Sequence, residues 1–167
     1  MSVQQATPKF TGFIRRLVED GLVSAENMQT AIMAAHKEKV DIVPYLIQNL
    51  NISPLLIAEK ISKEFGEPIF DLNVYDSALI VREGIDEKLF SKYNLLPIFK
   101  RNHLLYVATS NPTNIEAMDA IRFNSKMNIE AIVVEHDKLV KLIEQNFASE
   151  SAFEFEDDDF DLNFEDG

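Results

Sequence analysis

The chain has 167 residues, of which 46% are hydrophobic, and it carries a net charge of −12. This length allows one domain or two small ones, and the absence of cysteine excludes disulfides and thiolate metal sites. The acidic balance argues against nucleic-acid binding, and the chain has no apolar run of the ~18 residues that cross a bilayer. The first ten residues lack the layout of a secretory signal.

Residues 1–9 are expected to form a flexible arm, and residues 10–66 a helical domain. The apolar pattern of residues 13–32 recurs in residues 42–61, so that Leu17 corresponds to Leu46 and Ser24 to Ser53. In both copies the spacing is helical and predicts two helices. Each hairpin has one apolar face, and packing the two hairpins together buries both faces in a small four-helix domain.

The helix ends of this domain are marked by capping residues. Gly21 and Gly66 can supply the positive φ that ends a helix. Ser24, Asp41 and Ser53 are suitable N-caps, and a proline follows Ser53 at the first helical position. The caps therefore support the same four helices that the apolar pattern predicts.

Residues 67–148 have the pattern of a second domain, a small α/β sandwich, so the expected fold class is α+β. Thr113 and Glu116 have the spacing of a capping box. A tight turn is expected at Arg101 and Asn102. The predicted elements are a strand at 68–72, a helix at 84–94, strands at 95–101 and 103–110, a helix within 111–125, a strand at 127–135 and a helix at 136–147.

Residues 149–167 form an acidic tail that contains four phenylalanines. Nine acidic residues and no basic one lie between Glu150 and Gly167, which leaves −3 on the rest of the chain. Like charges repel and the few apolar groups do not offset chain entropy, so a disordered linker is expected. The alternative is a short linear motif that docks on a basic groove.

The sequence contains no motif of a recognised catalytic centre. It has neither a G-x-x-x-x-G-K-[ST] phosphate loop nor a G-x-G-x-x-G turn. The three histidines, at positions 36, 103 and 136, lack metal-ligand spacing and are expected at the surface or in turns. Ser91 and Ser110 have no evident His–Asp partners, and residues 109–114 suit a strand-to-helix connection better than a site loop. We therefore expect no enzyme activity, cofactor or metal in this chain.

Four stretches carry a resemblance to a known family: RRLVEDGLVS, the run from YLIQNLNIS to EFGEPIFDL, the run from YNLLPIFKRN to AIRF, and VVEHDKLVKLIEQNF. Together they resemble the N-terminal region of the type IV pilus assembly ATPase family PilB, whose relatives include the secretion ATPase GspE and the MSHA pilus ATPase MshE. The likeness covers nearly all of residues 10–147. It implies a helical first domain, an α/β second domain and a tail that links to an ATPase core.

The resemblance also implies a function. The family's ATPases are cytoplasmic hexamers at the inner face of the bacterial inner membrane, and their N-terminal domains are non-catalytic. They connect the motor to a PilZ-type adaptor and to platform proteins such as PilM. Hexamer contacts, ATP and magnesium would belong to the ATPase core, and this chain would be a fragment or a separate module that does not itself insert into the membrane.

An alternative function is direct cyclic-di-GMP sensing, since part of the family binds that ligand through a tandem helical motif. Each family copy begins Arg-Leu-Gly, but the first copy here has Gly12-Phe13-Ile14 and the second has Asp41-Ile42-Val43. Leu50 replaces a glycine later in the second copy. A dianion would lose its guanidinium partners and meet a carboxylate, which predicts that the repeat folds without binding the nucleotide.

The first helix is the expected docking surface. Arg15 and Arg16 could bind an acidic partner or a phosphate, although a charged solvent face is the simpler interpretation. Some apolar residues of this helix must face inward, and Ile14, Leu17 and Val18 are the most suitable. The candidate partner-binding residues are Phe10, Phe13, Arg15, Arg16 and Leu17.

Overall fold

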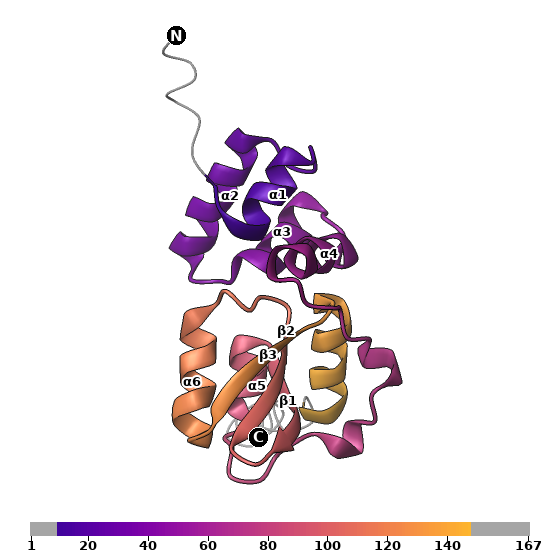
Figure 1. The fold of residues 1–167 in the computed structure, drawn as a ribbon. Helices are drawn as coiled ribbons and strands as arrows, with labels where there is room; N and C mark the ends of the chain where they lie inside the picture. The colour runs from indigo at the N-terminus through magenta and orange to yellow at the C-terminus, as the bar shows by residue number, and fades with distance from the viewer. Residues whose placement is uncertain (1–9, 148–167) are drawn as a thin grey trace, which may run out of the picture.

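The computed structural model describes residues 10–147. A block of four helices lies above a small α/β block, and the chain passes once from the first to the second (Figure 1). The predictions for the arm at 1–9 and for the acidic tail at 149–167 lie outside the described residues. No helix among those described has the length and apolar character needed to cross a bilayer.

The helical block is built from α1 (Gly12–Glu19), α2 (Ala25–Glu38), α3 (Ile42–Leu50) and α4 (Pro54–Phe65). α1 packs on α4, and α2 packs on α3, so each helix of one repeat meets a helix of the other. Two repeat-related leucines, Leu17 and Leu46, are fully buried in the shared core. The predicted closure of two hairpins over a common core is confirmed.

Local capping explains where these helices begin and end. The backbone N–H of Asn27 donates to Ser24 Oγ at 3.1 Å, and the N–H of Val43 donates to Asp41 Oδ1 at 2.8 Å. Ser53 caps α4 in the same way, at 3.4 Å from the N–H of Leu56. Gly66 ends α4 with a φ of 64°, a conformation that glycine adopts without strain. These four predicted caps are confirmed, and Gly21 also has the predicted positive φ, of 78°.

The α/β block contains a three-stranded sheet in the order β1-β2-β3. β1 (Leu95–Arg101) and β2 (Leu104–Thr109) are antiparallel around a turn at Asn102, whose φ is 57°. β3 (Asn128–Val133) runs parallel to β2, and α6 (Ile115–Ser125) forms the crossover. The block also contains α5 (Lys88–Tyr93), the 3-10 turns η2 (Leu72–Val74) and η3 (Ser77–Leu79), and a final helix at 136–147.

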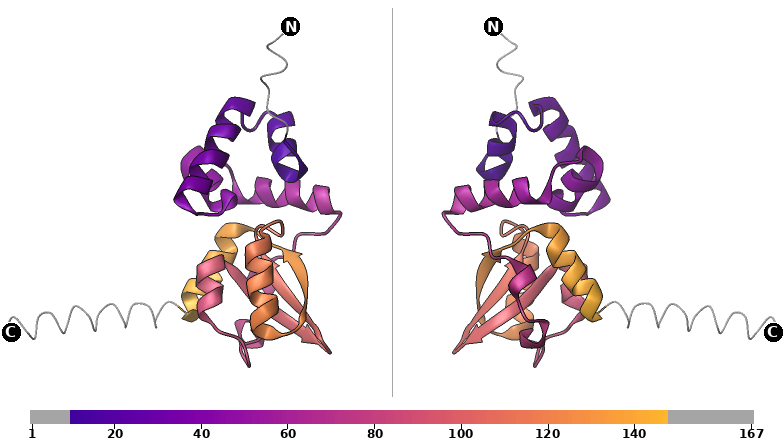
Figure 2. Two further views of the ribbon diagram at one scale, coloured as in Figure 1. Left: turned by 90° about the vertical axis from the view of Figure 1, so that its left-hand side faces the viewer. Right: turned by 90° about the vertical axis from the view of Figure 1, so that its right-hand side faces the viewer.

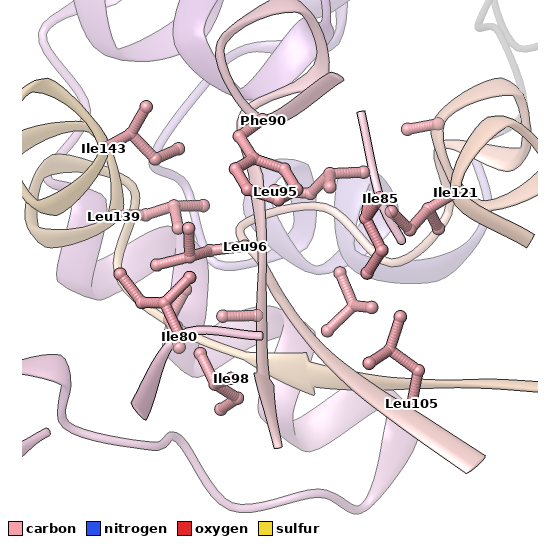
Figure 3. Packing of buried hydrophobic residues seen from close by; sticks show 14 of the residues in the cluster. Ile80, Ile85, Phe90, Leu95, Leu96, Ile98, Leu105, Ile121, Leu139 and Ile143 are labelled. Carbon is pink, nitrogen blue, oxygen red and sulfur yellow. The ribbon is translucent and has the colours of Figure 1, made fainter. Parts of the chain in front are cut away.

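Helices cover both sides of β1 and form the core of this block. In Figure 3, Leu139 and Ile143 of the final helix lie on one side of Leu95 and Leu96, and Ile121 of α6 lies on the other. All five side chains are buried. The α+β class and the predicted α/β sandwich are therefore confirmed.

One predicted strand and one predicted capping motif are wrong, and both errors have local causes. Residues 68–72 do not form a strand, because the Asp71 carboxylate accepts the N–H of Asn73 at 2.9 Å and starts a 3-10 turn. Among residues 68–72, only Phe70 forms a backbone hydrogen bond with the sheet, from its N–H to the carbonyl of Val133 at 2.8 Å.

The predicted capping box is also absent. Asn114 is the N-cap of α6 and accepts the N–H of Ala117 at 3.1 Å, whereas Thr113 bonds to Asn111. The helix predicted at 84–94 exists but is shorter, since α5 begins at Lys88.

Candidate functional site

The expected docking strip on α1 is only partly at the surface. The side chains of Phe13 and Leu17 are 2% and 0% exposed, because both fill the core of the helical block. Phe10 is half-buried against the same core. Phe13 and Leu17 are therefore structural residues: the inward position expected for Leu17 is confirmed, and neither side chain offers the accessible partner contact for which both were candidates.

Arg15 and Arg16 do reach the surface, and both point toward one carboxylate on α4. Arg16 Nε lies 2.8 Å from Glu64 Oε1, and Arg15 Nη2 lies 3.9 Å from the same oxygen. Arg15 also lies 3.9 Å from Glu19. Two guanidiniums thus share Glu64 at the seam between α1 and α4, and the Arg15 contacts with both carboxylates are the long ones.

A further ion pair connects α4 to the end of α1. Lys60 of α4 bonds to Asp20 just after α1, and this hydrogen bond lowers the pKa of the Asp20 carboxyl. The arginine face is consequently held on two packed helices rather than on a loop. Such a surface can present charge to a partner with little ordering cost.

The structure reveals a second candidate site, the junction between the two blocks. Asp41 caps α3, and its carboxylate also accepts hydrogen bonds from two amides of the α/β block. Asn111 Nδ2 lies 3.0 Å from Oδ1 and 3.2 Å from Oδ2, and Asn114 Nδ2 lies 2.8 Å from Oδ2. The Asp41 carboxylate therefore accepts hydrogen bonds from both blocks, from the N–H of Val43 in α3 and from the side-chain amides of Asn111 and Asn114.

The loop that supplies these amides is itself tightly organised. Asn111 is 5% exposed, and its Oδ1 accepts the N–H of Thr113 at 3.0 Å. Beside it, Ser110 Oγ lies 2.7 Å from Nδ1 of His136. The residues 109–114 are a strand-to-helix connection, as predicted, but they also bind the helical block.

His136 is buried, at 8% exposed, so the prediction of a surface or turn residue is wrong here. Burial lowers the pKa of His136, while the negative charges of Asp41 and Asp137 act in the opposite direction. Within residues 10–147 no carboxylate is hydrogen-bonded to this ring, so the Ser110–His136 contact is not a catalytic triad. It fastens the start of the final helix to the junction loop.

An apolar contact completes the junction. Val133, at the end of β3, is 2% exposed and packs into the core of the helical block together with Ile69. Beside the junction lies a cleft of about 820 Å³ with a mixed polar and apolar lining. The described part of the chain has no cluster of three metal-ligating side chains. The junction residues Asp41, Asn111 and Asn114 line this cleft, together with Lys39.

The repeat gives the position of Asp41 a particular meaning. Asp41 corresponds to Gly12 in the first copy, and both stand where the nucleotide-binding copies of the resembled family open with arginine. In this chain the second of these positions holds a carboxylate engaged by two asparagines. An incoming phosphate would meet this negative charge and compete with the junction.

Residues 65–153 match the MshEN domain, which covers more than half of the chain. The chain belongs to the MshEN domain family. This MshEN chain is 60% identical to the type IV pilus assembly ATPase PilB of Acinetobacter baylyi over 99% of its own length, and it spans 28% of that relative. It is 33% identical to PilB of Pseudomonas aeruginosa over 84% of its length, and it spans 25% of that protein.

Solved structures give the same fold. The MshEN chain matches the N-terminal domain of XpsE with a TM-score of 0.62 at 18% identity, over 82% of this chain and 97% of the other. It matches a structure of MshE with cdg with a TM-score of 0.58 at 19% identity, over 81% and 99% of the two chains. The predicted resemblance to the N-terminal region of the type IV pilus assembly ATPase PilB is confirmed, and the chain spans about a quarter of the length of its PilB relatives.

Sequence reasoning missed the junction residues. Asn111 and Asn114 have the composition of any turn, and the Ser110–His136 pair is separated by a whole crossover helix. The sequence predicts one junction residue, Asp41, and predicts it only as the N-cap of a helix. That its second role depends on another domain is not visible in local sequence.

Proposed function

We propose that this MshEN chain is the regulatory and protein-docking region of a cytoplasmic ATPase that powers type IV pilus extension. Its similarity to PilB supports this assignment, because the match extends over almost the whole chain. The motor itself, with its ATP, magnesium and hexamer contacts, would lie in the rest of such a protein, at the inner face of the inner membrane.

The observation that carries the docking role is the shared carboxylate at the α1–α4 seam. One Glu64 serves two guanidiniums, whose side chains are 49% and 34% exposed at Arg15 and Arg16. An acidic residue on a partner can replace the long 3.9 Å contact of Arg15 without breaking the 2.8 Å contact of Arg16. We propose a PilZ-type adaptor as this partner, with platform proteins such as PilM as further contacts.

Binding of the purified adaptor to the immobilised chain, followed by interferometry at two salt concentrations, tests the proposal. Arg15→Glu combined with Arg16→Glu should weaken binding by about tenfold or more, because like charges would face the acidic partner. The matched control is Lys88→Glu with Lys141→Glu, which reverses two exposed charges on the α/β block. Equal affinity for all three proteins, with unchanged circular dichroism, would contradict docking at the seam.

A second candidate function is direct cyclic-di-GMP binding. It is favoured by the fold match to MshE, whose structure was determined with cdg. The positions occupied by Gly12 and Asp41 oppose it, because neither side chain can pair with a phosphate. The two candidates differ in whether the isolated chain binds the dinucleotide, so calorimetric titration separates them.

A further inference from the structure

The end of the α/β block that lies away from the helical block has an unusual composition. Two segments, 99–103 and 122–126, each contain a phenylalanine and two cationic side chains. Phe99 is 56% exposed and Phe123 is 83% exposed, which is high for aromatic residues. We call this surface the basic end, and it comprises Phe99, Lys100, Arg101, His103, Arg122, Phe123 and Lys126.

Sheet pairing brings these two segments together. Arg101 pairs with Leu104, and Leu104 pairs with Asn128 on the next strand. The N–H of Asn128 donates to the carbonyl of His103 at 2.9 Å, and Lys126 ends α6 two residues earlier. The hairpin tip and the C-terminal end of α6 accordingly lie at the same extremity of the molecule (Figure 2).

The basic end keeps an excess of positive charge within an acidic protein. No acidic residue occurs between positions 94 and 115 or between 120 and 129, and the acidic residue that a hydrogen bond brings to the second segment is Asp86, whose N–H donates to Asn124 Oδ1 at 2.7 Å. Arg122 is paired with Asp119, but within residues 10–147 Lys100, Arg101 and Lys126 form no ion pair. An exposed surface with cations beside aromatic rings is complementary to a peptide that alternates carboxylates with apolar groups.

The chain contains such a peptide in residues 153–164, with the sequence FEFEDDDFDLNF. We propose that this segment docks on the basic end of its own chain, with its carboxylates toward Lys100, Arg101 and Lys126 and its phenylalanines toward Phe99 and Phe123. The segment has six acidic residues and four phenylalanines, so the cations of the basic end and its aromatic rings each have a complementary group in the segment. This inference is independent of the adaptor proposed for α1.

The distances along the chain permit docking within one molecule. Phe147, the last described residue, lies beside Phe90, with ring centroids 5.1 Å apart, and 4.5 Å from the guanidinium carbon of Arg82. The neighbouring Val81 donates its N–H to the carbonyl of Pro97 at 2.9 Å, which places Phe147 next to the start of β1. From Pro97 to Arg101 the strand advances about 13 Å. Residues 148–164 can span up to roughly 56 Å when extended, which exceeds this advance together with the separation between Phe147 and Pro97, so the segment can reach the basic end.

Salt should control this contact strongly. Single exposed ion pairs contribute little and are screened at physiological ionic strength. Several pairs acting together within one chain gain from a high effective concentration. The docked state should therefore dominate at low salt and be released at high salt.

Backbone-amide NMR of the complete, isotopically labelled chain tests the proposal. In the wild type, amide shifts of 153–164 and of the basic end should change together between about 20 mM and 500 mM salt. In the variant with Lys100→Glu and Arg101→Glu, the amide shifts of 153–164 at low salt should equal those that the wild type shows at high salt. The control, Lys37→Glu with Lys39→Glu on α2, has the same charge change far from the basic end and should keep the wild-type response.

Two results would overturn the proposal. One is a set of tail shifts at low salt that is identical in the wild type and in the Lys100→Glu, Arg101→Glu variant. The other is a salt response that grows with protein concentration, which would place the tail on a second molecule instead of its own. Unchanged core amide shifts verify that each variant is folded.

Discussion

The two helical hairpins have the same arrangement of helices and the same buried face, but their outer surfaces make different contacts. Leu17 in the first and Leu46 in the second are both fully buried, so the inward face is the same. The outward positions differ, because the first hairpin presents Arg15 and Arg16, and the second presents Asp41 to the α/β block. The comparison teaches that duplication conserved the packing face and left each outer face to acquire its own contact.

The largest effect is expected from two core substitutions, which test whether the inward faces of the two hairpins contribute equally to stability. Leu17→Ala and Leu46→Ala should each lower the free energy of unfolding by about 2–5 kcal/mol, because both remove a fully buried side chain and leave a cavity. Urea unfolding followed by circular dichroism measures both. If one substitution costs less than a fifth of the other, the two hairpins do not contribute equally to the core.

A substitution at Asp41 breaks the contact between the second hairpin and the α/β block, and its expected effect is the next largest. Asp41→Ala removes the cap of α3 and leaves the amides of Asn111 and Asn114 without their acceptor. The expected loss is roughly 1–3 kcal/mol, and the two blocks should unfold at separate temperatures.

The matched control is Ser53→Ala, which removes a cap of the same hairpin that has no partner in the α/β block. It should cost about 1 kcal/mol and leave unfolding as a single transition. Scanning calorimetry distinguishes the outcomes. A single transition for Asp41→Ala as well would show that the carboxylate does not couple the blocks.

A smaller effect is expected from pH at the same junction. Because burial holds the pKa of His136 below its usual value, the unfolded chain takes up a proton first as the pH falls. Stability should be constant above about pH 7 and decrease as the pH falls through about 6.5 toward 5. The lowered pKa values of Asp20 and Asp71 act in a separate window below about pH 4.

Melting temperatures between pH 7.5 and 5 check this prediction. His136→Gln should flatten the decrease, although it loses some stability at every pH because the contact with Ser110 is altered. His103→Gln changes an exposed histidine and should retain the wild-type slope. An unchanged slope in His136→Gln would assign the pH dependence to other groups.

The smallest effect concerns the first hairpin's outer contact. Arg16→Ala breaks the 2.8 Å pair with Glu64, yet a partly exposed ion pair contributes only about 0.2–1 kcal/mol. Thermal unfolding should show a correspondingly small change that shrinks further in 0.5 M salt. A loss above about 2 kcal/mol would mean that Arg16 is a structural residue rather than a surface available to a partner.

The sequence was sufficient for features that depend on near neighbours. Ser24, Asp41 and Ser53 were predicted as caps because a cap bonds to its own next turn. Residues 68–72 were mistaken for a strand, since an apolar run does not reveal that Asp71 turns the backbone away from the sheet. Sheet membership depends on distant partners, which local pattern does not contain.

The residues of the candidate sites also divide into those that local sequence predicts and those that depend on distant partners. The guanidiniums of Arg15 and Arg16 were predicted at the surface, but their common partner Glu64 lies three helices later. The burial of Phe13 depends on how α1 meets α4, and the burial of His136 depends on the junction loop. Neither follows from periodicity alone.

The central claim is that the repeated hairpins serve packing and docking, with Asp41 committed to the domain junction where a ligand arginine would otherwise stand. Isothermal titration of the full chain with cyclic-di-GMP tests this claim most directly. We predict no heat of binding above dilution at ligand concentrations up to about 100 μM, which corresponds to an affinity weaker than about −5 kcal/mol. Saturable binding with a Kd of a few micromolar or below would contradict the account.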